Sequence, residues 1–182
     1  MNARKTIAIA VILALAIGAY LFDQGRRERN EETRLQESRL VAAGSDSIVS
    51  LQLERRTSDE PIHLEKIDDR WRLTQPVADG ADEQTVRDLL RQIDQARRQT
   101  PFVPRGGVAE YGLDEPTVTV RITTVDGELP PLHIGDRTPD DTASYARFGD
   151  DREVFVVDRS LVRVLGSTVL QLRDKRLLPV DI

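Results

Sequence analysis

An uncharged apolar run near the start of the chain, residues 7–22, is the sequence feature that most limits how this protein can fold. It reads IAIAVILALAIGAYLF, with Arg4 and Lys5 before it and Asp23 directly after it. At about 1.5 Å per residue a helix of this run spans roughly 24 Å, somewhat less than the ~30 Å hydrocarbon core of a bilayer. Flanking basic side chains extend such a helix by snorkelling. The run therefore predicts a membrane anchor over residues 1–23.

The same run also fits a secretory signal peptide that is removed after export. The basic start is present, and residues 14–16, Ala-Leu-Ala, have the small-x-small form of a cleavage site, with a poorer candidate at residues 18–20. The apolar run continues to Phe22, beyond both sites, which favours an uncleaved signal anchor. Both alternatives stay open, whereas the basic residues in front of the run disfavour a buried core helix.

Basic residues on the two sides of the run give conflicting signals about its orientation. Arg4 and Lys5 favour a cytoplasmic amino terminus, whereas three arginines beyond the run favour the reverse, namely Arg26, Arg27 and Arg29. We favour the cytoplasmic amino terminus, because an apolar helix at the start of a chain is the usual form of an export signal. The bulk of the chain is then expected outside the cytoplasm.

The residues after the run divide into a charged stalk and a folded body. Residues 24–45 carry charges of both signs at helical spacing and few apolar side chains, which predicts a solvated helical stalk. Residues 46–182 remain, a length that suits one compact domain or two small lobes. The body is therefore expected to be a single exported domain with possible halves at residues 46–100 and 110–182.

Each predicted half contains strands followed by an amphipathic helix. In the first half, alternating apolar residues predict strands at residues 48–55, 62–67 and 71–75. A helix is predicted from a cap at Asp82 to about Arg98, because apolar residues recur there at i, i+3, i+4 and i+7. Residues 101–109 are predicted to form a loop, since they begin with a proline and contain two adjacent glycines.

The second half repeats this order. Strands are predicted at residues 117–125, 128–134, 144–148 and 153–157. Asp126-Gly127 predicts a hairpin turn, and Pro130-Pro131 is expected to confine the return strand to a sheet edge. Asp158 is expected to cap a short helix that Gly166 ends. The pattern predicts an α+β fold with antiparallel sheet in two strand-strand-helix halves, preceded by one transmembrane helix.

Composition excludes several classes of function. The net charge is −5 with acids and bases interleaved, and no basic patch with spaced aromatic residues occurs, so nucleic acid is not an expected partner. The chain has no cysteine, which excludes disulfides, thiolate metal sites, cysteine nucleophiles and lipid attachment through a lipobox.

Catalytic and metal-binding motifs are also missing from the sequence. The two histidines, His63 and His133, lie in predicted strands without zinc-site spacing, and the acids of residues 136–151 lack the spacing of a calcium loop. No GxSxG elbow, P-loop or GxGxxG motif is present. We therefore expect a protein that is not an enzyme and has no catalytic residues, cofactor or metal. Trp71, the only tryptophan, is expected in the core.

Short motifs in a fixed order give the body a family resemblance. Trp71-Arg72-Leu73-Thr74-Gln75-Pro76 opens the series, and Tyr111-Gly112-Leu113-Asp114-Glu115-Pro116 follows in the middle. Leu132-His133-Ile134-Gly135, Tyr145-Ala146-Arg147 and Leu172-Arg173-Asp174-Lys175 complete it. The chain resembles the bacterial domain-of-unknown-function 4340 family over about residues 48–178. The motif positions, which we expect to be structural, are Trp71, Pro76, Tyr111, Gly112, Leu113, Pro116, Gly135 and Tyr145.

The resemblance implies a location and a set of neighbours. Proteins of that family carry one N-terminal membrane helix and are often encoded beside ABC transporter subunits of the gliding-motility auxiliary type. No activity or catalytic residue can be carried over from it. The expectation is a single-pass protein of the bacterial inner membrane, with its body in the periplasm or outside, that serves as a protein-binding accessory to the membrane subunits of an ABC transport system.

Two other functions stay open. The body could be an envelope module that binds or senses a glycan or lipid in a cleft between its halves. A hydrolase would require His63 or His133 beside several acids in a cleft.

Overall fold

The computed structural model describes residues 38–41 and 44–174. The predicted anchor and most of the predicted stalk lie outside these residues. Within the described part of the chain, no helix has the length and apolar character needed to cross a membrane. The fold below is that of the compact unit that begins at Arg39.

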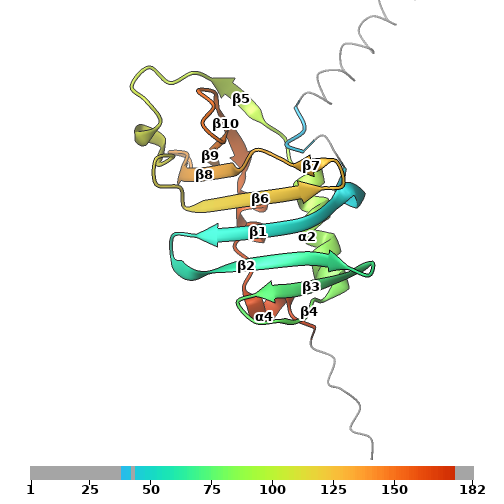
Figure 1. Ribbon diagram of the computed structural model, residues 1–182. Helices are drawn as coiled ribbons and strands as arrows, with labels where there is room; N and C mark the ends of the chain where they lie inside the picture. Colours follow the sequence, from blue (N-terminus) through green and yellow to red (C-terminus); the bar gives the residue numbers. More distant parts are fainter. Residues whose placement is uncertain (1–37, 42–43, 175–182) are drawn as a thin grey trace, which may run out of the picture. The chain divides into compact units, whose positions relative to one another are not determined.

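One continuous antiparallel sheet of ten strands forms the described body (Figure 1). The strands run in the spatial order β4-β3-β2-β1-β6-β8-β9-β10-β5, and the short β7 pairs with β6. Their bounds are β1 Ile48–Arg55, β2 Ser58–Ile67, β3 Arg70–Gln75, β4 Asp79–Gly80, β5 Gln99–Phe102, β6 Val118–Thr124, β7 Gly127–Glu128, β8 Leu132–Arg137, β9 Ala143–Phe148 and β10 Val154–Asp158. The predicted α+β class with antiparallel sheet is confirmed at this level.

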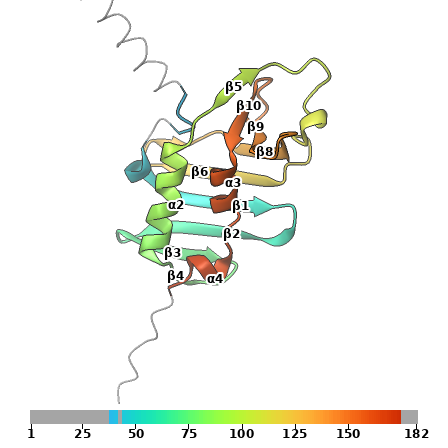
Figure 2. The same cartoon turned by 180° about the vertical axis from the view of Figure 1, so that it is seen from behind.

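Three helices lie on one face of the sheet (Figure 2). They are α2 Glu83–Gln95, α3 Arg159–Leu165 and α4 Val169–Leu172. The predicted apolar face of α2 is buried, namely Val86, Leu89, Leu90 and Ile93. Asp82 caps this helix by accepting a hydrogen bond from the Thr85 backbone N–H at 2.7 Å. This face shares one hydrophobic core with inward side chains of the strands, such as Leu51 and Leu53, and burial of this apolar surface stabilises the domain.

The sheet is built from two antiparallel meanders, a first one of β1–β4 and a second one of β6–β10. Their first strands, β1 and β6, lie side by side at the centre of the sheet. β1 pairs with β6, from Ile48 opposite Thr124 to Arg55 opposite Val118. From this central pair, β2–β4 extend the sheet in one direction and β8–β10 in the other. The helix that follows each meander, α2 or α3, returns to the same face, where the two helices contact each other.

The segment that follows the helix of one meander bonds to the outer end of the other meander. β5 follows α2 in sequence but pairs with β10, the outermost strand of the second meander. In return, the segment around α4 reaches the first meander, where the Asp82 N–H donates to the Leu172 carbonyl at 2.8 Å and the Asp174 N–H to the Gly80 carbonyl at 2.9 Å. Leu172 is fully buried in the shared core. The two meanders are therefore joined at both outer edges as well as at the centre.

Four differences from the sequence-based expectation have physical causes. β8 begins after Pro131 and lies inside the sheet, so the prolines precede the strand and do not confine it to an edge. Residues 58–61, which lie between two predicted strands, extend β2, and residues 99–102, which lie after the predicted helix and at the start of the predicted loop, form β5 because β10 offers a free edge. Residues 39–41, expected in the stalk, join the body: Leu40 and Val41 are buried, and the Leu40 N–H donates to the Ala96 carbonyl at 3.0 Å.

Candidate functional site

Six of the eight predicted motif positions lie in or beside one loop, residues 103–117, which connects β5 to β6. We call it the motif loop. This loop contains the short 3-10 turn η2, Ala109–Tyr111, and runs on to β6. The six positions are Tyr111, Gly112, Leu113 and Pro116 in the loop, Gly135 in β8 and Tyr145 in β9. The other two, Trp71 and Pro76, lie on and just after β3, on the far side of the central strands.

The two glycines of this group allow the loop to lie directly against β8. Gly112 has a φ of 65°, in the left-handed region that glycine adopts without strain. At Gly135 a Cβ atom would overlap the backbone of Tyr111 and Gly112, so only glycine permits this approach. The Thr117 N–H then donates to the Ile134 carbonyl at 2.7 Å, which starts β6 beside β8. Glycine is therefore needed at both positions, because here the backbone of the loop packs directly against the backbone of β8.

The loop also completes an aromatic cluster made of Phe102, Tyr111 and Tyr145. The Tyr111 and Tyr145 ring centroids lie 4.7 Å apart at 72°, and those of Tyr111 and Phe102 lie 5.3 Å apart at 65°. Such edge-to-face contacts contribute about 0.5–1.5 kcal/mol each beyond burial. The cluster ties η2 to β5 and β9.

Trp71 packs in the core as expected. It is 6% exposed, and its backbone N–H donates to a carboxylate oxygen of Glu83, the first residue of α2, at 2.8 Å. This contact joins β3 to the beginning of the helix. Pro76 follows β3 through a cis peptide bond and is half-buried.

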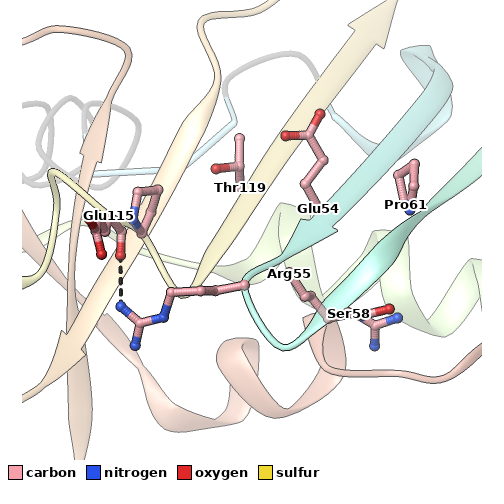
Figure 3. A pocket seen from close by; sticks show the side chains of 8 residues that line it. Glu54, Arg55, Ser58, Pro61, Glu115 and Thr119 are labelled. Atoms are coloured by element: carbon pink, nitrogen blue, oxygen red, sulfur yellow. Dashed lines mark hydrogen bonds between the residues drawn. The ribbon is translucent and has the colours of Figure 1, made fainter.

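A pocket of about 500 Å³ opens where the β1–β2 hairpin meets the end of the motif loop (Figure 3). Its volume falls within the 300–1,000 Å³ typical of small-molecule sites. It lies between the two predicted halves, since residues of both line it. The lining residues are Glu54, Arg55, Arg56, Ser58 and Pro61 from the hairpin, and Glu115, Pro116 and Thr119 from the other side.

Charged side chains on both sides of this pocket form hydrogen bonds and ion pairs with their neighbours. Arg56 donates from Nη1 to the Glu115 carbonyl oxygen at 3.0 Å, which bridges the two sides of the pocket (Figure 3). Glu54 accepts a hydrogen bond from Gln52 at 3.0 Å and forms an ion pair with Arg121 at 3.3 Å. Arg55 instead donates to the carbonyl oxygen of Ser167 at 2.8 Å and so anchors the segment after α3.

Polar residues of the central strands continue from the pocket across the sheet face that the helices leave uncovered. We call this surface the open face and define it by Gln52, Glu54, Arg121, His133 and Arg147, which are cross-strand neighbours with half-buried side chains. Burial and the nearby Arg147 and Arg121 guanidinium groups lower the pKa of His133. The open face is therefore a hydrogen-bonding surface whose side chains partly satisfy one another.

The contacts of His63 do not form the relay of a serine hydrolase. Its Nε2 lies 2.9 Å from the Ser50 hydroxyl and 3.3 Å from a Glu65 carboxylate oxygen. A serine–histidine–acid relay requires the hydroxyl and the carboxylate at opposite ring nitrogens, whereas both groups here approach the same nitrogen. Among the described residues, no group of three or more histidine, cysteine or acidic side chains has the arrangement of a metal site.

Sequence reasoning did not identify the pocket residues as a group. Glu54, Arg56 and Thr119 belong to no recognisable motif, and the pairing of β1 with β6 brings them together. The available signal was Glu115-Pro116 at the end of the middle motif, since this dipeptide forms one wall of the pocket.

A family model described as "Domain of unknown function (DUF4340)" matches residues 71–182. Neither a curated protein nor a solved structure matches the chain. The matched segment covers more than half of the chain and begins at Trp71, the first residue of the opening motif.

Proposed function

Because the chain belongs to the DUF4340 family, we propose that it is a non-enzymatic protein-binding module, held by the apolar run at residues 7–22 with its body outside the cytoplasm. Its expected partners are the membrane subunits of an ABC transport system in a bacterial inner membrane. The anchor contributes through effective concentration, since a tethered domain meets a membrane partner far more often than a free one does.

The observation that carries this proposal is the open face. The helices cover one side of the sheet, and the other side presents rows of donors and acceptors on a rigid antiparallel scaffold. Glu54, Gln52 and Arg121 bond to one another and do not converge on a reacting atom. A polar surface of this kind suits contact with another protein, because protein interfaces combine direct hydrogen bonds with bridging water.

Site-specific crosslinking in native membranes tests the proposal. A photo-reactive residue at Arg121, on the open face, should crosslink to a transporter membrane subunit. The same residue at Arg87, on the exposed side of α2, is the matched control and should give little of that product. Absence of any transporter subunit from the Arg121 products, or equal yields from both positions, would contradict the proposal. A reporter at the carboxyl terminus that is active only in the cytosol would contradict the orientation.

A second function, binding of a glycan or lipid, is favoured by the pocket of about 500 Å³ between the two predicted halves. Its carboxylates and the Arg56 guanidinium suit the hydroxyl groups of a sugar. A glycan and lipid library should then contain a compound that raises the melting temperature, since a ligand at 100 times its Kd stabilises a protein by about 2.7 kcal/mol. Glu54→Gln should remove the effect, and Glu65→Gln, on β2 outside the pocket, should retain it.

A further inference from the structure

A second, smaller pocket on the helix-bearing side contains three arginines. It lies where α3 packs beside β9 and has a volume of about 210 Å³. It is lined by Arg137 at the end of β8, Arg159 and Arg163 on α3, and by Asp141, Ala143, Ser144 and Val162. The lining therefore carries three positive charges against one negative charge. We call it the arginine pocket.

The single carboxylate of the arginine pocket bridges two of its arginines. Arg137 Nη1 lies 2.9 Å from Asp141 Oδ1, and Arg159 Nη1 lies 3.0 Å from Asp141 Oδ2. Arg163 forms no ion pair with any carboxylate of the described residues. The two guanidinium groups thus each hold one oxygen of the carboxylate, and the third cation, Arg163, has no acidic partner among the described residues.

The loop that carries Asp141 is held in place by its own hydrogen bonds. Asp140 accepts from the Thr138 hydroxyl at 2.6 Å and from the Thr142 hydroxyl at 2.8 Å, and these bonds lower the pKa of its carboxyl group. The Arg159 N–H donates to the Thr142 carbonyl at 3.2 Å, which joins the loop to the start of α3. Among the described residues, Asp140 therefore bonds to the two threonines and forms no ion pair with an arginine of the pocket.

We propose that the arginine pocket binds a phosphate-type oxyanion, which replaces the Asp141 carboxylate between Arg137 and Arg159 and also contacts Arg163. Guanidinium groups match the geometry of phosphate oxygens and bind them through paired charge-assisted hydrogen bonds. The Asp141 ion pairs are about half exposed and so contribute little stability, which makes the carboxylate replaceable by a group of higher charge. The volume lies below the range of drug-sized sites and suits a single small anionic group.

Phosphate binding to the full-length chain tests this inference, with inorganic phosphate as the probe against chloride at equal ionic strength. Asp141→Asn should tighten phosphate binding about fivefold, because the competing carboxylate is removed. Asn also tolerates the positive φ of 57° at this position. Arg163→Gln should weaken binding about fivefold. Arg91→Gln, an exposed arginine on α2, is the matched control and should leave the affinity unchanged.

The source of the anion, a free phosphate or a lipid headgroup, is distinguished by competition. Vesicles that contain phosphatidylglycerol should compete with inorganic phosphate for the wild-type protein if the ligand is a headgroup, whereas vesicles of phosphatidylcholine alone should not. Competition by neither vesicle, with phosphate binding intact, assigns the pocket to a free anion. Phosphate binding that is absent, or that Asp141→Asn and Arg163→Gln leave unchanged, would overturn the inference.

Discussion

The backbone carbonyl of Tyr111 lies directly against the α-carbon of Gly135. This contact presses the motif loop onto β8, and the Thr117 N–H bond to the Ile134 carbonyl follows from it. Residues 111 and 135 come from two separate motifs of the sequence. Their contact therefore joins the two motifs in the folded chain.

Gly135→Ala should therefore destabilise the domain. The added methyl group meets backbone atoms, which cannot move aside as a flexible side chain would, so we expect a loss of about 1–3 kcal/mol in the free energy of unfolding. Urea unfolding monitored by the buried Trp71 measures this. Gly80→Ala is the control, because a Cβ there would meet only the Asp174 Cβ, at 3.6 Å. Equal stability of the two variants would show that the close approach is not required.

Asp82→Ala should weaken α2 more than Asp158→Ala weakens α3. The Asp82 side chain accepts a hydrogen bond from the Thr85 N–H, whereas Asp158 precedes α3 without a capping side-chain bond. Removing a capping side chain typically costs about 1 kcal/mol. Thermal unfolding of the two variants should show a lower melting temperature for Asp82→Ala alone, and the reverse order would contradict the capping assignment.

Leu172→Ala should lower stability by roughly 2–5 kcal/mol, as truncation of a fully buried leucine does. The neighbouring Leu170→Ala is a matched control because Leu170 is 69% exposed. Both residues lie on α4, so a difference between the variants isolates the burial of Leu172. If the two variants unfold alike in urea, the segment around α4 does not stabilise the first meander.

Stability should depend on pH through His133. Its folded pKa lies below the ordinary value of 6.5, because of burial and the nearby Arg147 and Arg121. As pH falls, His133 therefore binds a proton in the unfolded chain before it does so in the folded chain. The contribution of His133 to the free energy of unfolding is complete above about pH 6.5 and is lost as pH drops toward the folded pKa.

His133→Gln should flatten the stability curve between about pH 6.5 and pH 5, above the range where ordinary carboxylates titrate. His63→Gln retains His133 and should keep the slope that His133 produces. Urea unfolding midpoints of the two variants and the wild type, measured across this pH interval, test the prediction. An unchanged slope in His133→Gln would mean that other groups control it.

Local patterns predicted the elements well where a side-chain period and a boundary signal agreed. The strand at residues 48–55 and the apolar face of α2 were predicted from alternation and from helical spacing, and both are present. Asp126-Gly127 predicted the β6–β7 turn. These elements depend on interactions between residues close in sequence, which a single sequence displays.

Pairings between distant segments could not be predicted in the same way. Residues 99–102 contain a proline and show no alternation, and they form β5 only because β10 presents a free edge. The pocket lined by Glu54 and Thr119 depends on the pairing of β1 with β6, and the arginine pocket depends on the packing of α3 beside β9. Neither arrangement has a local sequence signal, because each is set by the order of strands in the sheet.

The bond network between the α4 segment and β4 has a consequence for biosynthesis. Arg173 contacts Asp79 across 94 residues of chain. At a translation rate of about 5–20 residues per second, roughly 5–19 s pass between the synthesis of Asp79 on β4 and the synthesis of Arg173. The nascent chain must be kept from associating through the bare outer edge of the first meander during this interval, and the domain acquires its native form only when almost all of it has been synthesised.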